Sequence, residues 1–91
     1  MSDPDPELLA WLALRRVRGG GVAEVGGYYL DHGLPVPAYL ADPFAELTED
    51  GLVALAAADP AGLRRATITP TGQARYTALR ERLRPTQPGI T

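Results

Sequence analysis

The sequence contains no cysteine, no lysine and no asparagine, and its only serine is Ser2. Without cysteine there is no disulfide, no thiolate metal ligand and no cysteine nucleophile, and a reducing compartment is the simplest setting. No apolar run approaches the ~18 residues that a membrane span requires. The acidic, proline-punctuated start MSDPDPE differs from a signal peptide, which is basic and then apolar. We therefore expect a cytoplasmic protein without a membrane segment.

The scarcity of reactive side chains also argues against catalysis. Ser2 falls in a terminal tail, and His32, the single histidine, has only the adjacent Asp31 as an evident partner. A lone histidine at the end of an element is more often a terminus residue than a base or a metal ligand. Glu49 and Asp50 are neighbouring carboxylates, but adjacent helical residues do not face one cleft. We expect no catalytic residue, no metal site, no cofactor and no enzyme activity.

Charge is distributed unevenly along the 91 residues, and all nine basic residues are arginine. Residues 1–60 carry three arginines and ten acidic residues, a net charge of −7, whereas residues 61–91 carry six arginines and one acidic residue, a net charge of +5. This asymmetry favours an anionic partner for the C-terminal third, or pairing between the two parts of neighbouring molecules. The length and the 45% hydrophobic content indicate one compact domain.

The first predicted helix runs from Pro6 to about residue 18. Asp5 is suited to cap it and Pro6 to occupy its first position, while the three glycines at 19–21 end it. A glycine run can also form a phosphate-binding loop. Here no strand is predicted before it and no Gly-Lys-Ser/Thr follows, so the interpretation as a helix end and turn is favoured.

Residues 22–30, VAEVGGYYL, are the most ambiguous segment. Their valines, Tyr29 and Leu30 can be placed at helical spacing, which favours a short helix. The pair Gly26-Gly27 weakens a helix by ~1 kcal/mol per glycine relative to alanine. The alternative is a short strand in which the paired glycines mark a bulge or a close backbone approach.

Two short helical pieces are expected before the middle of the chain. Residues 38–40 follow a proline-rich entry and predict a turn of helix. Asp42 is suited to cap a second piece and Pro43 to begin it, because proline cannot sit deep in a straight helix. Gly51 ends this piece.

The C-terminal third predicts a hairpin followed by a helix. Residues 52–58 and 63–69 have strand character, and the tetrad Asp-Pro-Ala-Gly at 59–62 fits a type I turn. This turn sets a register that pairs Val53 with Ile68 and Leu55 with Ala66. Thr69 then caps a helix that starts at Pro70 and ends near residue 84, and its expected buried stripe is Gly72, Tyr76, Leu79 and Leu83.

Two motifs in this order resemble the winged helix-turn-helix domains of MarR- and PadR-type bacterial transcriptional regulators. LTEDGLV at residues 47–53 is similar to the end of a recognition helix entering the first wing strand. ITPTG at residues 68–72 is similar to the segment that closes the wing and opens the next helix. The resemblance covers most of residues 8–84. It implies a mainly α fold with a small β-hairpin, that is, three to four helices and a two- or three-stranded wing sheet over residues 6–84, between flexible tails at 1–5 and 85–91.

The resemblance also implies a transcriptional regulator that contacts double-stranded DNA mainly by wing and arginine-phosphate contacts, as a homodimer. Carried over by position, the wing contacts are Arg64 and Arg65, and the helix-turn-helix contacts are Tyr39 and Thr48. The residues expected to form the partner helix are Arg75, Tyr76, Leu79, Arg82 and Leu83.

A second hypothesis follows from the charges themselves. The segment 37–50 carries four acidic residues, which oppose binding to a phosphate backbone. Such a segment could instead pair with the arginine-rich last helix of another molecule. The alternative function is therefore a protein interaction or dimerisation module without sequence-specific DNA binding.

Overall fold

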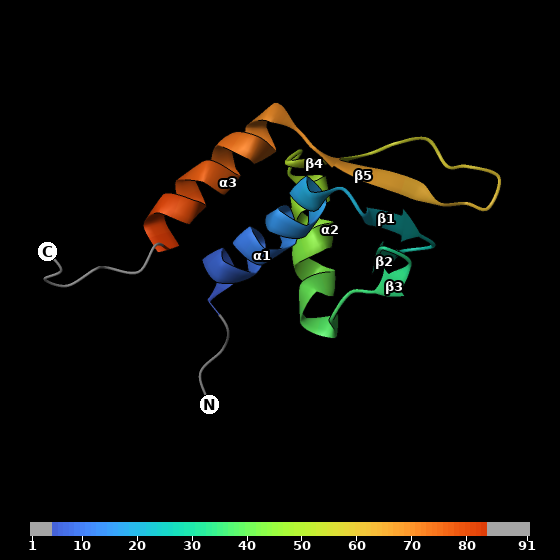
Figure 1. Cartoon of the computed structure of the whole chain (residues 1–91), viewed down its shortest axis with the longest axis horizontal. Helices are drawn as coiled ribbons and strands as arrows, with labels where there is room; N and C mark the ends of the chain where they lie inside the picture. The colour runs from blue at the N-terminus through green and yellow to red at the C-terminus, as the bar shows by residue number, and fades with distance from the viewer. Residues whose placement is uncertain (1–4, 84–91) are drawn as a thin grey trace, which may run out of the picture.

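The computed structural model describes residues 5–83, with helices gathered at one end and strands at the other (Figure 1). The elements in chain order are α1 (Pro6–Gly19), β1 (Val22–Val25), β2 (Tyr28–Asp31), β3 (Leu34–Pro35), the 3-10 turn η1 (Ala38–Leu40), α2 (Ala41–Glu49), β4 (Val53–Leu55), β5 (Arg64–Ile68) and α3 (Pro70–Leu83). Except for Asp5, the predicted tails at 1–5 and 85–91 lie outside the described residues. Among residues 5–83, no helix is long and apolar enough to cross a membrane.

The strands form one antiparallel sheet in the order β3-β2-β1-β5-β4. Strand β1 joins the N-terminal hairpin to β5 through the pairs Ala23↔Arg65 and Glu24↔Arg64. A five-stranded sheet exceeds a small wing hairpin, so the expected mainly α, winged helix-turn-helix fold is wrong. Residues 5–83 contain three α-helices, and the β1–β2 hairpin occupies the position of the short helix expected over residues 22–30.

The favoured helix over residues 22–30 is wrong for a local reason. Gly26 and Gly27 both have positive φ, +55° and +90°. These are the two central residues of the tight turn between β1 and β2, and a two-residue hairpin turn of this kind requires positive φ at both. The strand alternative was therefore correct, with the glycines forming a turn and no bulge.

Helix α1 follows the prediction closely. The side chain of Asp5 accepts a hydrogen bond of 2.9 Å from the backbone N–H of Glu7, and Gly20 closes the other end in the left-handed conformation. The predicted cap of α2 is wrong. Helix α2 begins at Ala41 directly after η1, without a side-chain cap, and Pro43 lies in its first turn, where a missing N–H costs no hydrogen bond.

The β4–β5 hairpin has the predicted register, with Val53 opposite Ile68 and Leu55 opposite Ala66. The predicted turn is confirmed by a 2.8 Å hydrogen bond from the N–H of Gly62 to the carbonyl of Asp59. Strand β4 ends at Leu55, earlier than expected, and residues 56–63 form the loop to β5.

Thr69 links this hairpin to α3. Its hydroxyl oxygen accepts a 2.9 Å hydrogen bond from the N–H of Gly72, which confirms the predicted cap, and it lies 3.1 Å from the carbonyl oxygen of Leu52. A Cβ at position 72 would overlap that carbonyl, so only glycine lets α3 begin this close to β4.

The core lies where the three helices meet the inner face of the sheet. Phe44 of α2 is fully buried and stacks on Tyr29 of β2 at 5.0 Å between ring centroids. The remaining buried hydrophobic residues of this cluster are Ala13, Leu14, Val17, Val22, Leu40, Leu47, Leu52, Val53, Ala66, Tyr76 and Leu79. All three helices therefore contribute side chains to one core. Helices α1 and α3 lie side by side (Figure 1).

Candidate nucleic-acid interface

Two stacked aromatic rings, each with a guanidinium group over it, lie along the seam between α1 and α3. The rings of Trp11 and Tyr76 are stacked, with centroids 6.1 Å apart and planes 9° apart. The guanidinium carbon of Arg15 lies 5.4 Å from the centroid of Trp11, and that of Arg18 lies 5.0 Å from the centroid of Tyr76. Arg15 reaches Trp11 because residues four apart lie on the same face of a helix.

This arrangement places two cations on an exposed surface with restricted freedom. Arg18 also donates from Nε to Oε1 of Gln73 at 3.2 Å, which ties α1 to α3 a second time. A guanidinium that stacks on a ring keeps its in-plane N–H donors available. Arg15 and Arg18 can therefore donate to an incoming phosphate with less loss of conformational entropy than free side chains.

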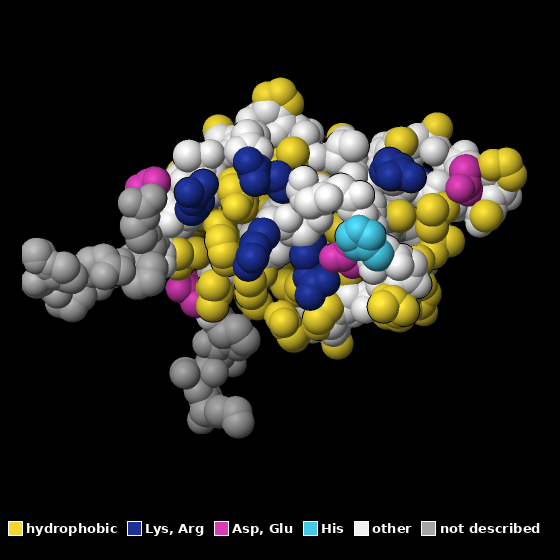
Figure 2. All heavy atoms as spheres, viewed as in Figure 1, with side chains coloured by type: hydrophobic (Ala, Val, Ile, Leu, Met, Phe, Trp, Pro, Cys, Tyr) yellow, Lys and Arg dark blue, Asp and Glu magenta, His cyan; other side chains and the backbone are white. Residues whose placement is uncertain are grey.

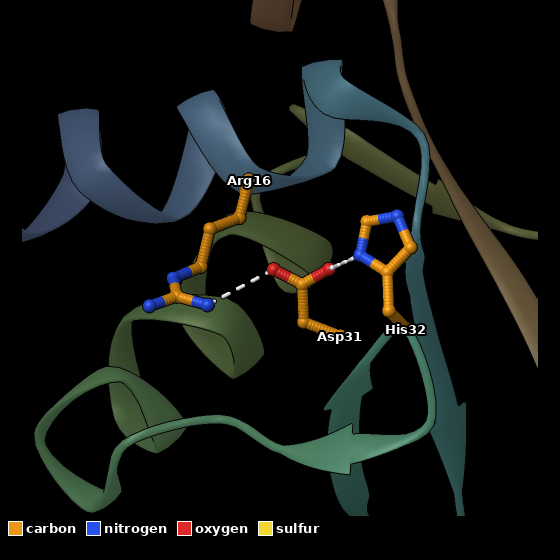
Figure 3. Close-up of polar contacts among 3 residues, drawn as sticks. All are labelled: Arg16, Asp31 and His32. Atoms are coloured by element: carbon orange, nitrogen blue, oxygen red, sulfur yellow. Dashed lines mark hydrogen bonds and ion pairs between the residues drawn. The ribbon is translucent and has the colours of Figure 1, made fainter.

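A polar cluster lies beside this seam, where α1 meets the end of β2. Arg16 donates from Nη1 to Oδ2 of Asp31 at 2.9 Å, and Nδ1 of His32 lies 2.7 Å from Oδ1 of the same carboxylate (Figure 3). Asp31 is mostly covered, while the His32 side chain is 77% exposed. Asp31 thus balances the charge of Arg16 and orients the imidazole, whose Nε2 points away from the carboxylate.

These groups share one side of the molecule. Figure 2 shows arginine side chains spread over α1, α3 and the sheet, on the face where the single histidine is visible, while acidic side chains appear singly. We call the residues Arg15, Arg16, Arg18 and Arg65 the arginine face. The first three belong to the last turns of α1, and Arg65 of β5 lines a pocket with His32.

The two predicted wing residues do not point the same way. Arg64 donates from Nε to the carbonyl of Ala56 at 3.1 Å across the β4–β5 loop. Arg65 follows it in the strand and is therefore on the opposite face of the sheet, next to Ala23 of β1. The structure brings Arg65, and not Arg64, to the pocket beside His32.

The two residues predicted from the helix-turn-helix resemblance have different surroundings. The Thr48 hydroxyl donates to the carbonyl of Phe44 at 2.9 Å and lies 3.1 Å from the hydroxyl of Tyr29. Its polar atom is thus engaged within the chain. Tyr39 lies in η1 and is 54% exposed.

The residues predicted to form the partner helix fall into a buried group and an exposed group. Tyr76 and Leu79 are buried against α1 and the core of this chain, and Leu83 packs against that core. Arg75 and Arg82 are exposed and line a groove, and Arg82 forms a 2.6 Å ion pair with Glu7. Only the arginines of this set are open to a partner.

The groove, which has a volume of ≈ 890 Å³, lies between α1, α2 and α3. Asp42 and Glu46 of α2 and its C-cap Asp50 line one side, whereas Arg75 and Arg82 of α3 line the other. Its apolar lining comes from Leu9, Ala10, Pro43, Leu47, Leu52, Ala78 and Leu79. No ion pair joins α2 to α3 within residues 5–83.

Comparison of the chain with protein-family models, curated proteins and solved structures finds no match. A function must therefore be argued from the geometry of this chain. The sequence analysis missed the cluster of Arg15, Trp11, Tyr76 and Arg18. Only the four-residue spacing of Trp11 and Arg15 could have suggested part of it, because the other contacts depend on how α3 packs against α1.

Proposed function

We propose that the protein binds double-stranded DNA through the arginine face, by contacts to the phosphate backbone, and acts in the cytoplasm as a DNA-binding regulator. The observation that carries this proposal is the pair of guanidinium groups held over aromatic rings, Arg15 on Trp11 and Arg18 on Tyr76. Arginine donors that are fixed in position on an exposed surface suit phosphate oxygens. Phosphate contacts supply most of the affinity of non-specific DNA binding.

The acidic helix α2 takes no part in this contact. Asp42, Glu46 and Asp50 line the groove, and none of the four residues of the arginine face is part of its lining. DNA that docks on the arginine face thereby avoids the repulsion that these carboxylates would exert on its phosphates. We infer binding with little sequence discrimination, because base reading requires side chains placed in a groove of the DNA.

The relation to MarR- and PadR-type regulators stays a proposal that rests on the two motifs. LTEDGLV spans the end of α2, where Gly51 has a φ of +77°, and ITPTG contains the Thr69 cap of α3. We propose a binding role rather than a catalytic one, because the His32–Asp31 pair has no cysteine, lysine or serine beside it in residues 5–83.

The direct test of DNA binding is a titration of a fluorescently labelled duplex with the protein at low salt. Binding should be seen with duplexes of unrelated sequence and should weaken steeply as salt is added. R15Q/R18Q is the informative variant, because it removes both stacked cations. R75Q/R82Q removes the same amount of charge from the α3 side of the groove, and it should bind with an affinity closer to that of the unmodified protein.

The groove supports a second candidate function, self-association. Its two sides have opposite charge, and its lining between them is apolar. A second copy of the chain, placed by a two-fold axis, would present α3 arginines to α2 carboxylates and α2 carboxylates to α3 arginines. This candidate predicts salt-sensitive dimers in sedimentation velocity, and a monomer at all salt concentrations would exclude it.

A further inference from the structure

A small pocket, with a volume of ≈ 270 Å³, lies on the outer face of the sheet beside the end of α1. Gly20 and Gly21 form one side of it, His32 another, and Arg65 of β5 a third. This volume is below the range of about 300–1,000 Å³ that is usual for sites of drug-sized ligands. A small group such as a single phosphate fits a pocket of these dimensions better than a large organic molecule.

His32 is held at this pocket by its backbone and by its ring. It has a φ of +53°, which is uncommon for a residue other than glycine, in the turn between β2 and β3. Its N–H donates to the carbonyl of Gly21 at 2.8 Å, and Asp31 holds Nδ1 at 2.7 Å. A hydrogen-bonded Nδ1 leaves Nε2 as the nitrogen that can meet a ligand.

Gly21 makes this position of the ring possible. A Cβ built on Gly21 would overlap the imidazole of His32. The first glycine of the run, Gly19, has open space around its Cβ position. Of these two glycines, therefore, only Gly21 is required for the contact between the turn and the histidine.

Arg65 supplies the cation of the pocket. Its side chain is exposed, and among residues 5–83 it makes no hydrogen bond or ion pair. The carboxylate beside His32, that of Asp31, already pairs with Arg16. The end of α1 carries a partial negative charge, which Arg16 and Arg18 in its last turn offset. The surroundings of Arg65 thus favour an anion.

We propose that this pocket binds one phosphate group, with the Arg65 guanidinium donating two hydrogen bonds and the His32 imidazole, held through Nδ1 by Asp31, forming the opposite wall of the site. The identity of this phosphate rests on the proposed DNA-binding function: if the protein binds DNA, a backbone phosphate of the DNA occupies the pocket. A free phosphate ester has the same chemistry and is the other source. The pocket thereby fixes the position of the arginine face along the DNA strand.

The test begins with inorganic phosphate as the probe, in an NMR titration of the full chain at constant ionic strength with chloride as the reference anion. We expect saturable shifts at the amides of Gly20, Gly21 and His32 and at the His32 ring. R65Q should weaken phosphate binding at least about tenfold, as expected for the loss of charge-assisted hydrogen bonds. R75Q, in the groove, should leave it unchanged.

A pair of glycine variants tests the role of the ring without removing a charge. G21A should displace the exposed imidazole and weaken phosphate binding several-fold, while the chain remains folded by circular dichroism. G19A should bind phosphate like the unmodified protein. Shifts that are spread over all arginines, or equal binding by R65Q and the unmodified protein, would overturn the proposal.

A second arm with duplex DNA distinguishes the sources. Site-specific phosphate binding together with a loss of DNA affinity in R65Q supports a backbone phosphate. Site-specific phosphate binding without any DNA binding overturns the proposed function and assigns the pocket to a free phosphate ester. DNA binding that R65Q leaves unchanged, without phosphate shifts at the pocket, overturns the pocket and leaves the proposed function standing.

Discussion

The guanidinium of Arg18 lies 5.0 Å from the centre of the Tyr76 ring, and this contact joins the last turn of α1 to α3. Tyr76 in turn stacks on Trp11, which carries Arg15 on its ring. Packing between the two helices therefore determines where two of the exposed cations lie. Under the proposed function, the packing of this seam affects both stability and DNA binding, and suitable substitutions can separate the two effects.

The first prediction concerns the aromatic support of Arg18. Y76F keeps the ring and should leave DNA affinity unchanged, because no hydrogen bond of the Tyr76 hydroxyl is found within residues 5–83. Y76L keeps apolar bulk but removes the ring, which leaves Arg18 held only by its hydrogen bond to Gln73. An exposed cation–π contact is worth about 0.5–1 kcal/mol, so DNA binding should weaken about two- to fivefold in an anisotropy titration. Equal affinity of Y76L and Y76F would show that the ring does not matter.

The second prediction concerns the close approach of α3 to β4. G72A should lower the free energy of unfolding by about 1–3 kcal/mol, because the new methyl group overlaps the Leu52 carbonyl and the backbone must shift. Urea denaturation monitored by circular dichroism measures this change. G19A is the control, since a Cβ there meets nothing within 4 Å, and its stability should stay within about 0.5 kcal/mol of the original.

The third prediction concerns the hydroxyl of Thr69. T69V has nearly the same shape but loses the cap of α3 and the hydrogen bonds to the carbonyls of Gly51 and Leu52. We expect a loss of about 1–2 kcal/mol of stability. T69S restores the hydroxyl and should recover most of it. A T69V protein as stable as T69S would mean that the hydroxyl contributes nothing to the junction.

The fourth prediction tests self-association through the groove by charge reversal. R75E and E46R each place like charges on both sides of the groove, so each should weaken dimerisation in sedimentation velocity. The double variant R75E/E46R restores opposite charges with their positions exchanged, and it should dimerise better than either single variant. Additive losses in the double variant would argue against a pairing of these two sides.

The elements that could be predicted have local signals. The cap of α1, the turn at 59–62, the register of the β4–β5 hairpin and the Thr69 cap are all encoded within a few residues, and the structure confirms each of them. The helix expected over 22–30 failed because the apolar spacing there was compatible with two structures. Strand β1 of this segment pairs with β5, which lies far along the chain, and no local pattern indicates that pairing.

The sequence predicted that arginines would form the candidate site, but not which arginines come together. The excess of arginine in the C-terminal third pointed to an anionic partner, but the arginine face draws three of its four members from α1. The stack of Trp11 on Tyr76 requires the packing of α1 against α3, which no local pattern specifies. Likewise, Arg16 meets Asp31 only because β2 ends beside the last turns of α1 (Figure 3).

The most direct test of phosphate binding by the arginine face is the salt dependence of affinity for a labelled DNA duplex between roughly 50 and 200 mM salt. Arg16 is paired with Asp31, so three arginines of the face remain for phosphates, and the slope of log K against log salt should be about −3. R18Q should reduce its magnitude by about one, and R75Q should leave it unchanged. Absence of binding at the lowest salt, or the same slope in R18Q and the unmodified protein, would contradict the assignment of DNA binding to this face.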